Sequence, residues 1–187
     1  MNTLFPIEPV YPPGFQYHPD FLTNEEEQGL LAIVREIELH TFRFQGYEAK
    51  RKVASFGFDY SFDTGTLKKG QPIPSEFTWL VERVALRLGR KTDEFAELLV
   101  TEYPAGAVIN WHRDAPPFDV IAGVSLSADC IFKMRPYEKK DAKGGIINLP
   151  VQRRSLYIME GLSRSSWQHA TAPVRDTRYS ITLRTLR

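Results

Sequence analysis

Two histidines and one aspartate in this chain have the residue types and spacing of a metal site. His112 and Asp114 stand two positions apart, and His169 follows an apolar stretch far downstream. Because alternate residues of an extended segment project from the same face, His112 and Asp114 can converge on one ion. Two imidazoles and one carboxylate form the facial triad of non-haem Fe(II) oxygenases, whereas zinc is the alternative for the same ligand types. We therefore predict His112, Asp114 and His169 as metal ligands and as the catalytic centre.

Two arginines near the C-terminus point to an acidic ligand beside this metal. Arg178 and Arg184 are six positions apart in a strand-like segment, so they share one face. Inward-facing cations are costly to bury unless they are paired, and no nearby run of acidic residues would pair them. A dicarboxylate would do so through bidentate contacts to guanidinium. The arginine pair therefore favours an iron enzyme with an acidic cosubstrate over a zinc hydrolase.

Composition places this chemistry in an ordinary soluble domain. The chain has 187 residues, of which 42% are hydrophobic and 25% are charged, and one domain is the expected organisation. The single cysteine, Cys130, excludes an intramolecular disulfide, and we interpret it as a core residue of a protein in a reducing compartment, which suits ferrous iron. The absence of a long apolar run or a signal pattern predicts a cytoplasmic protein without a membrane span. The net charge of +1 does not indicate a polyanionic partner.

The N-terminal half must supply the elements that support and cover the site. Five prolines in residues 1–20 predict an irregular arm. A capping box that starts at Thr23 and apolar residues at helical spacing predict a helix over 23–38. A second helix is expected over 75–89, with Gly89 as its C-terminal cap, after a loop over 65–74.

An aromatic and basic stretch lies between the two expected helices. Residues 41–62 have a strand-like pattern in which four aromatics alternate and would share one face: Phe56, Phe58, Tyr60 and Phe62. Packing on the core is one interpretation of these rings. The other is a stacking surface for a flat base, with the neighbouring Lys50, Arg51 and Lys52 available for phosphate.

Short strands dominate the C-terminal half. Candidates lie near 99–103, 107–112, 120–126, 130–135, 145–149, 155–159 and 179–185, with glycine- and proline-rich turns between them. Many short strands with such turns are typical of a sandwich, jelly roll or barrel.

The combined motif His112-x-Asp114, His169 and Arg178-x5-Arg184 resembles the AlkB family of Fe(II)- and 2-oxoglutarate-dependent dioxygenases. Segments around Tyr103–Gly106, Val124–Leu126, Arg154–Gly161 and Trp167–His169 also resemble this family. The resemblance covers 99–187 well, and the N-terminal half only in organisation. It implies an α+β, mainly β fold in one domain, 1–187, and we expect a monomer. Residues 99–187 would form the double-stranded β-helix (jelly-roll) core, and 1–98 would form the arm, two supporting helices and an aromatic-basic lid.

The resemblance also implies roles for individual residues. Tyr103 and Arg178 would bind the distal carboxylate of 2-oxoglutarate, and Arg184 would hold the end that chelates Fe(II). Two hydroxyl residues, Thr101 and Ser180, stand where family members often have an amide and would contribute to the same cosubstrate site. Pro116 stands where some members have an acid that contacts the substrate base, so a family-typical base preference is not expected.

The activity implied by the resemblance is oxidative demethylation of alkylated DNA or RNA bases with O2, releasing formaldehyde, succinate and CO2. Between Lys133 and Arg154 there are seven basic residues and two acids, a local balance of +5 that could form a phosphate-binding rim or a solvated loop face. The substrate-binding candidates are Phe56, Phe58, Tyr60, Arg51, Lys52 and Arg135. Alternatives are a 2-oxoglutarate-dependent oxygenase of a protein or small molecule, and a noncatalytic jelly-roll binding module.

Overall fold

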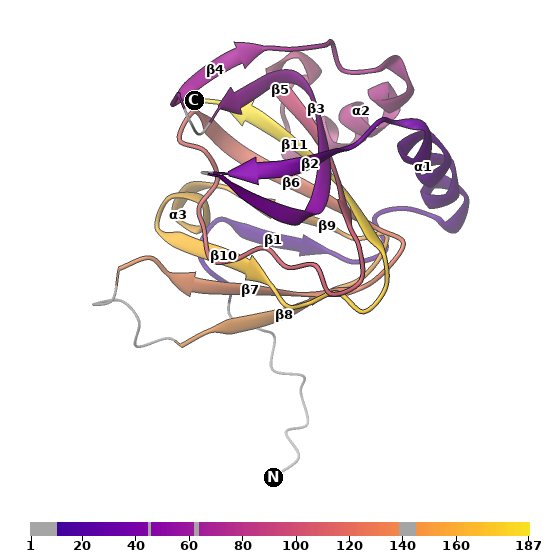
Figure 1. Cartoon of the computed structure of the whole chain (residues 1–187). Helices are drawn as coiled ribbons and strands as arrows, with labels where there is room; N and C mark the ends of the chain where they lie inside the picture. The colour runs from indigo at the N-terminus through magenta and orange to yellow at the C-terminus, as the bar shows by residue number, and fades with distance from the viewer. Residues whose placement is uncertain (1–10, 45, 62–63, 139–144) are drawn as a thin grey trace.

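The computed structural model describes residues 11–44, 46–61, 64–138 and 145–187, which form three layers (Figure 1). The middle layer is a large antiparallel sheet in the order β1-β9-β6-β11-β5-β3-β2, with β4 paired to β3. Its strands are β1 (Phe15–His18), β9 (Leu156–Met159), β6 (Phe118–Leu126), β11 (Arg178–Leu186), β5 (Phe95–Tyr103), β3 (Tyr47–Ser61), β2 (His40–Phe44) and β4 (Thr66–Lys69). A smaller sheet faces it, in the order β10 (Trp167–Thr171), β7 (Cys130–Pro136) and β8 (Ile147–Val151).

The third layer consists of the helices α1 (Asn24–Glu36) and α2 (Thr78–Leu88), which pack on the other face of the large sheet. The capping box predicted for α1 is present, because Glu26 N–H donates to the Thr23 hydroxyl and Thr23 N–H donates to the Glu26 carboxylate. Helix α2 follows the 3-10 turn Ser75–Phe77 and ends at Gly89, whose φ of 63° is the left-handed conformation of a C-terminal cap.

Two hydrophobic clusters separate these layers and decide which way each strand residue faces. One lies between the helices and the large sheet and includes Leu98, Val100 and Ile181. The other lies between the two sheets and includes Phe132 and Met134. Alternation along β5 and β11 therefore turns their buried polar residues, which include Thr101, Arg178 and Ser180, toward the small sheet.

Several elements differ from the sequence prediction. The arm expected over 1–20 includes an edge strand, β1, although residues 1–10 lie outside the described part of the chain. The loop expected over 65–74 contains β4, and the strand expected near 107–112 forms only the isolated bridge between His112 and His169. The short helix α3 (Gly161–Ser165) and strand β10 were not predicted. No helix among the described residues has the length and apolar character needed to cross a membrane.

Gly57 divides the long strand β3 into two parts with different partners. The strand pairs with β5 as far as Gly57 and with β4 from Phe58 onward. Gly57 has a φ of 84°, and a side chain there would overlap the backbone oxygen of Ala96. This position requires glycine, and the left-handed residue interrupts the alternation that the sequence pattern implied.

Candidate metal and cosubstrate site

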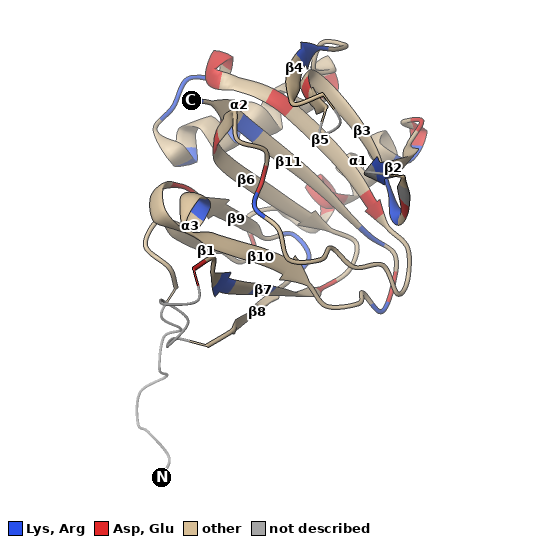
Figure 2. Ribbon diagram, turned by 60° about the vertical axis from the view of Figure 1, so that its left-hand side comes forward, with Lys and Arg blue, Asp and Glu red and all other residues tan. Residues whose placement is uncertain are grey.

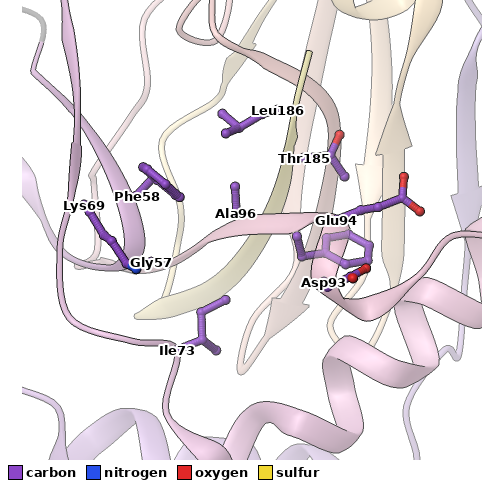
Figure 3. Close-up of a pocket in the computed structure, with 10 residues that line it drawn as sticks. Gly57, Phe58, Lys69, Ile73, Asp93, Glu94, Ala96, Thr185 and Leu186 are labelled. Atoms are coloured by element: carbon purple, nitrogen blue, oxygen red, sulfur yellow. The ribbon is translucent and has the colours of Figure 1, made fainter.

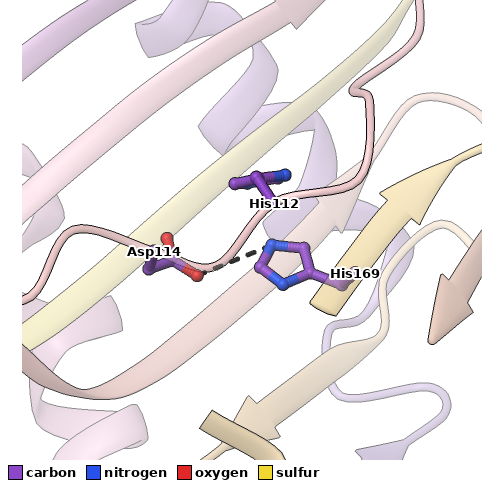
Figure 4. A group of neighbouring side chains, drawn as sticks. All are labelled: His112, Asp114 and His169. Carbon is purple, nitrogen blue, oxygen red and sulfur yellow. Dashed lines mark ion pairs between the residues drawn. The ribbon is translucent and has the colours of Figure 1, made fainter. Parts of the chain in front are cut away.

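The three predicted metal ligands lie together between the two sheets (Figure 4). His112 is in an extended segment that pairs with β10, because its N–H donates to the His169 carbonyl at 3.1 Å and its carbonyl accepts from the His169 N–H at 2.9 Å. This bridge sets the two imidazole centroids 4.2 Å apart. One ligand atom from each of His112, Asp114 and His169 lies within 4.8 Å of the other two. The group therefore has the size and composition needed to hold one metal ion.

The ligand atoms have lone pairs that are not used in hydrogen bonds and are therefore available to a metal. The Asp114 Oδ2 atom is buried and accepts no hydrogen bond, and it lies 3.5 Å from Nε2 of His169. The Nδ1 atom of His112 lies 2.8 Å from the backbone oxygen of Asn110, so this nitrogen carries the hydrogen and Nε2 can coordinate a metal. A buried, unpartnered carboxylate oxygen between two imidazoles fits a divalent cation.

The protonation states of these groups also suit metal binding. Burial, and next the neighbouring His112, lower the pKa of His169 to about 3. Burial likewise lowers the pKa of His112. Burial opposes ionisation of Asp114, but the positive charges around it, that of Arg184 first, outweigh this effect and lower its pKa. At neutral pH the site therefore offers two neutral imidazoles and one carboxylate, which are the protonation states that coordinate a metal.

Arg184 is paired with two acids, which corrects the expectation that no acid would neutralise it. Its guanidinium donates to Glu97 Oε2 at 2.6 Å and to Asp114 Oδ1 at 2.8 Å. Glu97 lies opposite Arg184 in the β5–β11 register and also accepts a hydrogen bond from the Ser55 hydroxyl at 2.8 Å. The Nε atom of Arg184 is buried and has no partner, so one donor is left for a ligand.

Arg178 lies on the same face of β11 in a different setting. Its side chain is 3% exposed, donates from Nε to the Ser125 hydroxyl at 2.9 Å, and lies 5.0 Å from the centroid of the Tyr103 ring. No carboxylate in the described part of the chain lies within ion-pairing distance of it. The predicted hydroxyl residues Thr101 and Ser180 are paired in register beside it and are buried. Arg178 thus provides a buried positive charge that an acidic ligand can neutralise.

Two further residues shape this site and were not found from the sequence. Tyr157 on β9 packs over Gly123, whose missing side chain leaves room for the ring, and burial raises its pKa. Arg164 on α3 donates to the backbone oxygens of Asp114, Ala115 and Phe118 at 3.2, 2.7 and 2.9 Å. Arg164 therefore holds the segment that carries the candidate ligand Asp114. Neither residue belongs to a spacing motif, so only their contacts identify them.

The structure separates the aromatic residues that the sequence placed on one face. Phe56 packs with the cluster on the helix side of the large sheet, whereas Tyr60 packs with the cluster between the sheets. Phe58 lines a third location, a cavity of about 510 Å³ with Lys69 and Leu186 among its walls (Figure 3). The prediction of a shared face was wrong because Gly57 changes the course of β3, and Phe62 lies outside the described residues.

The basic candidates are also distributed. Arg51 stacks on the Phe42 ring at 3.9 Å, and its charge contributes to the lowered pKa of His112, so it lies toward the metal site. Lys52 pairs with Glu102 at 3.5 Å, which reduces its availability for phosphate. Arg135 on β7 stacks on the Trp111 ring at 4.3 Å. Lys139, Lys140 and Lys143, which contributed to the local positive balance, lie outside the described residues.

Comparison with known proteins gives this geometry a family context. The family model described as the 2OG-Fe(II) oxygenase superfamily matches residues 14–184. A solved structure of OsALKBH1 superposes with a TM-score of 0.74 and 14% identity, covering 95% of this chain and 99% of that one. This likeness confirms the predicted double-stranded β-helix core.

Curated relatives extend the comparison to sequence. The tRNA (carboxymethyluridine(34)-5-O)-methyltransferase alkbh8 of Xenopus tropicalis is 26% identical over 172 residues, which cover 89% of this chain and 26% of the relative. The Alkylated DNA repair protein ALKBH8 homolog of Arabidopsis thaliana is 29% identical over 179 residues, covering 84% and 50%. The human Alpha-ketoglutarate-dependent dioxygenase alkB homolog 3 is 29% identical over 90 residues, covering 42% and 32%. This chain thus spans from about a quarter to half the length of these relatives.

Proposed function

Because this chain belongs to the 2OG-Fe(II) oxygenase superfamily and is AlkB-like, we propose that it is a 2-oxoglutarate-dependent dioxygenase acting on alkylated bases of nucleic acid. The observation that carries this proposal is the convergence of His112, Asp114 and His169 beside the buried Arg178 and the partly buried Arg184. A metal-binding triad alone would fit many enzymes. The adjacent Arg178, a buried cation without an acidic partner in the described structure, adds the requirement for an anionic cosubstrate.

The triad residues would hold Fe(II), since their donor atoms face one another and are in their coordinating protonation states. When bound, Fe(II) and 2-oxoglutarate supply the oxidising chemistry, in which O2 is consumed and 2-oxoglutarate is converted to succinate and CO2. The chain's own contribution is to position these groups. Arg164 fixes the Asp114 segment, and Arg184 keeps the Asp114 carboxylate ionised and oriented.

The two ends of 2-oxoglutarate would be held by different arginines. Arg178 and Tyr103 would bind the distal carboxylate, because the guanidinium lies against the Tyr103 ring and has no acidic partner among the described residues. Thr101 and Ser180 are the adjacent hydroxyls, and Arg184 offers its unpaired Nε–H to the other end. A dicarboxylate bridging these positions would be oriented by two charged groups before any substrate binds.

The names of the relatives support a nucleic-acid substrate, since one names tRNA and another names repair of alkylated DNA. In this chain Arg51 lies toward His112, so a cation stands near the triad, and Arg135 is on β7 of the small sheet, where it stacks on Trp111. We propose oxidation of an N-methyl group, in which its carbon gains a hydroxyl and the product separates into free amine and formaldehyde. Phe58, Tyr60 and Lys52 remain candidate substrate contacts, and a cytoplasmic monomer completes the proposal. Phe56 lies on the helix side, so a direct contact to the base is not proposed.

A panel of methylated RNA and DNA oligonucleotides tests this function. With Fe(II) and 2-oxoglutarate supplied, mass spectrometry should show loss of a methyl group together with succinate and formaldehyde. Asp114→Ala should abolish turnover, whereas the exposed His40→Ala should retain it as a matched control. Succinate production that is independent of every oligonucleotide would instead favour a protein or small-molecule substrate. Failure of the purified protein to bind Fe(II) and 2-oxoglutarate would favour a noncatalytic module.

A further inference from the structure

The small sheet has an outer face that the proposed reaction does not use. His112, His169 and Met134 are paired in register and point into the space between the sheets. Because neighbouring residues of extended strands alternate in direction, the residues beside these three project to the opposite side. Besides the buried Ala170, they are Trp111, Arg113, Gln168, Lys133 and Arg135, and Tyr137 follows at the end of β7. We call this set the outer face.

Two arginines on the outer face are stacked on aromatic rings. The Arg135 guanidinium lies 4.3 Å from the Trp111 ring centroid and donates to Gln168 Oε1 from Nε at 3.0 Å and from Nη2 at 2.9 Å. The Arg113 guanidinium lies 3.9 Å from the Tyr137 ring centroid and donates to the Ser165 carbonyl at 3.0 Å. Both side chains are therefore held in place while other N–H groups of each guanidinium remain available.

The charge of the outer face has one sign. Arg113, Lys133 and Arg135 form no ion pair with an acid in the described parts of the chain. The end of β7 is basic in Figure 2, and the acid Glu138 comes only after the strand has ended. Tyr137 is 51% exposed and Ile131, on the same side of β7, is 39% exposed. Such interleaving of unpaired cations with exposed apolar groups is more than a solvated strand needs.

A structural explanation for the stacked pairs exists, since an exposed cation–π contact stabilises a fold by roughly 0.5–1 kcal/mol. That explanation accounts for each pair separately. It does not account for Lys133, which adds a third cation beside them, or for the position of both pairs on either side of His112. Trp111 and Arg113 flank that candidate ligand in the sequence, so the outer face begins at the segment that builds the metal site.

We infer that the outer face binds a single-stranded stretch of the nucleic acid that flanks the base in the site, an inference that rests on the proposed function. Guanidinium planes and aromatic rings stack on bases without regard to sequence, and cations contact phosphates. This surface would thus provide affinity for the strand, whereas the site selects the modified base.

Anisotropy of a fluorescent, unmodified single-stranded oligonucleotide across a salt series tests this inference with the full chain. Lys133→Gln/Arg135→Gln should weaken binding by about tenfold at 0.1 M salt. It should also lower the slope of log Kd against log salt by about 1.4, because each phosphate contact on a single strand contributes roughly 0.7. The matched control is Arg87→Gln/Lys91→Gln, which removes the same charge at the end of α2, in the helix layer. This control should leave the slope unchanged.

The outcomes separate the surface from the proposed function. Equal slopes for the two double variants would overturn the outer face while leaving a nucleic-acid substrate intact. A wild-type protein that binds neither RNA nor DNA would overturn both. A loss of binding with a lowered melting temperature would be checked with Arg135→Lys, which preserves the charge. If Arg135→Lys restores folding and the salt slope, the outer face is supported, and if it restores folding alone, the inference is wrong.

Discussion

Arg178 and Arg184 occupy the same face of β11, six positions apart, yet the charges around them differ. Arg184 donates to the carboxylates of Glu97 and Asp114, whereas Arg178 is bonded to the neutral hydroxyl of Ser125. The Arg184 end is therefore neutralised by the protein itself, and its geometry is set before a ligand arrives. The Arg178 end keeps a buried positive charge that only a ligand can neutralise. We infer that the two arginines have different roles. Arg184 holds the metal ligand Asp114 in place, and Arg178 supplies affinity for the cosubstrate.

The largest effect is expected when the paired arginine is removed. Arg184→Met leaves two buried carboxylates without their cation, and breaking a buried pair from one side costs about 3–5 kcal/mol. Urea denaturation of the metal-free protein should show this decrease in the free energy of unfolding. Arg184→Met/Glu97→Met should recover part of it, because one stranded charge is then removed as well. An unchanged unfolding free energy for the single variant would contradict the assigned ion pairs.

Arg178→Met should have the opposite pattern, with a large effect on ligand binding and little on the fold. We expect the affinity for 2-oxoglutarate, measured by calorimetry with Mn(II) in the metal site, to fall by about 100-fold, since contacts to a charged group contribute about 1.5–3 kcal/mol each. The free energy of unfolding without ligand should stay the same or increase, because an unpaired buried charge is removed. A strongly destabilised variant with normal 2-oxoglutarate affinity would reverse the roles of the two arginines.

A third arginine, the buried Arg164, tests whether a missing acidic partner always marks a ligand site. Arg164 forms no ion pair in the described structure either, but it donates to three backbone oxygens of the Asp114–Phe118 segment. Arg164→Met should lower the free energy of unfolding by about 2 kcal/mol, because these carbonyls lose a charged donor. It should also weaken binding of Mn(II) by at least about tenfold. If the variant loses cosubstrate affinity and keeps normal metal binding, then Arg164 resembles Arg178, and backbone contacts do not distinguish structural from ligand-binding arginines.

These arginines also show which features of the site the sequence predicts and which it does not. The spacing of Arg178 and Arg184 predicted their shared face, because alternation is a property of one strand. Their partners were not predictable, because Glu97 is 87 residues from Arg184 and meets it through the register of β5 and β11. The triad was predictable only as a set of residue types, since the bridge that joins His112 to His169 has no local signal.

The prediction that the aromatic residues of β3 share one face was wrong for a related reason. Strict alternation placed Phe56 with Tyr60, but the left-handed backbone at Gly57 changes the pairing partner of the strand between them. A glycine in the middle of a strand pattern signals such an irregularity. Which side of the sheet the following side chains point to depends on the close approach to Ala96, which belongs to a different strand. Local periodicity predicts elements and faces, and contacts between distant strands decide which residues meet.

The smallest effect on the free energy of unfolding is expected for a carboxylate–guanidinium pair at the surface. Glu26 on α1 accepts hydrogen bonds from Arg83 on α2, one of them at 2.8 Å, and Arg83 is the first cause of the lowered pKa of Glu26. Both side chains are partly exposed, so water screens the pair, and Glu26→Gln should decrease the free energy of unfolding by less than about 1 kcal/mol at pH 7. A carboxyl whose pKa is lower in the folded than in the unfolded state stabilises the fold above its ordinary pKa near 4.5. The difference in the free energy of unfolding between wild type and Glu26→Gln should therefore disappear as the pH falls through the folded-state pKa, when measured by urea denaturation across an acid series.

A decrease for Glu26→Gln at pH 7 as large as that expected for Arg184→Met would show that burial does not distinguish the two ion pairs. The contrast between Arg178 and Arg184 along β11 would then need a different explanation.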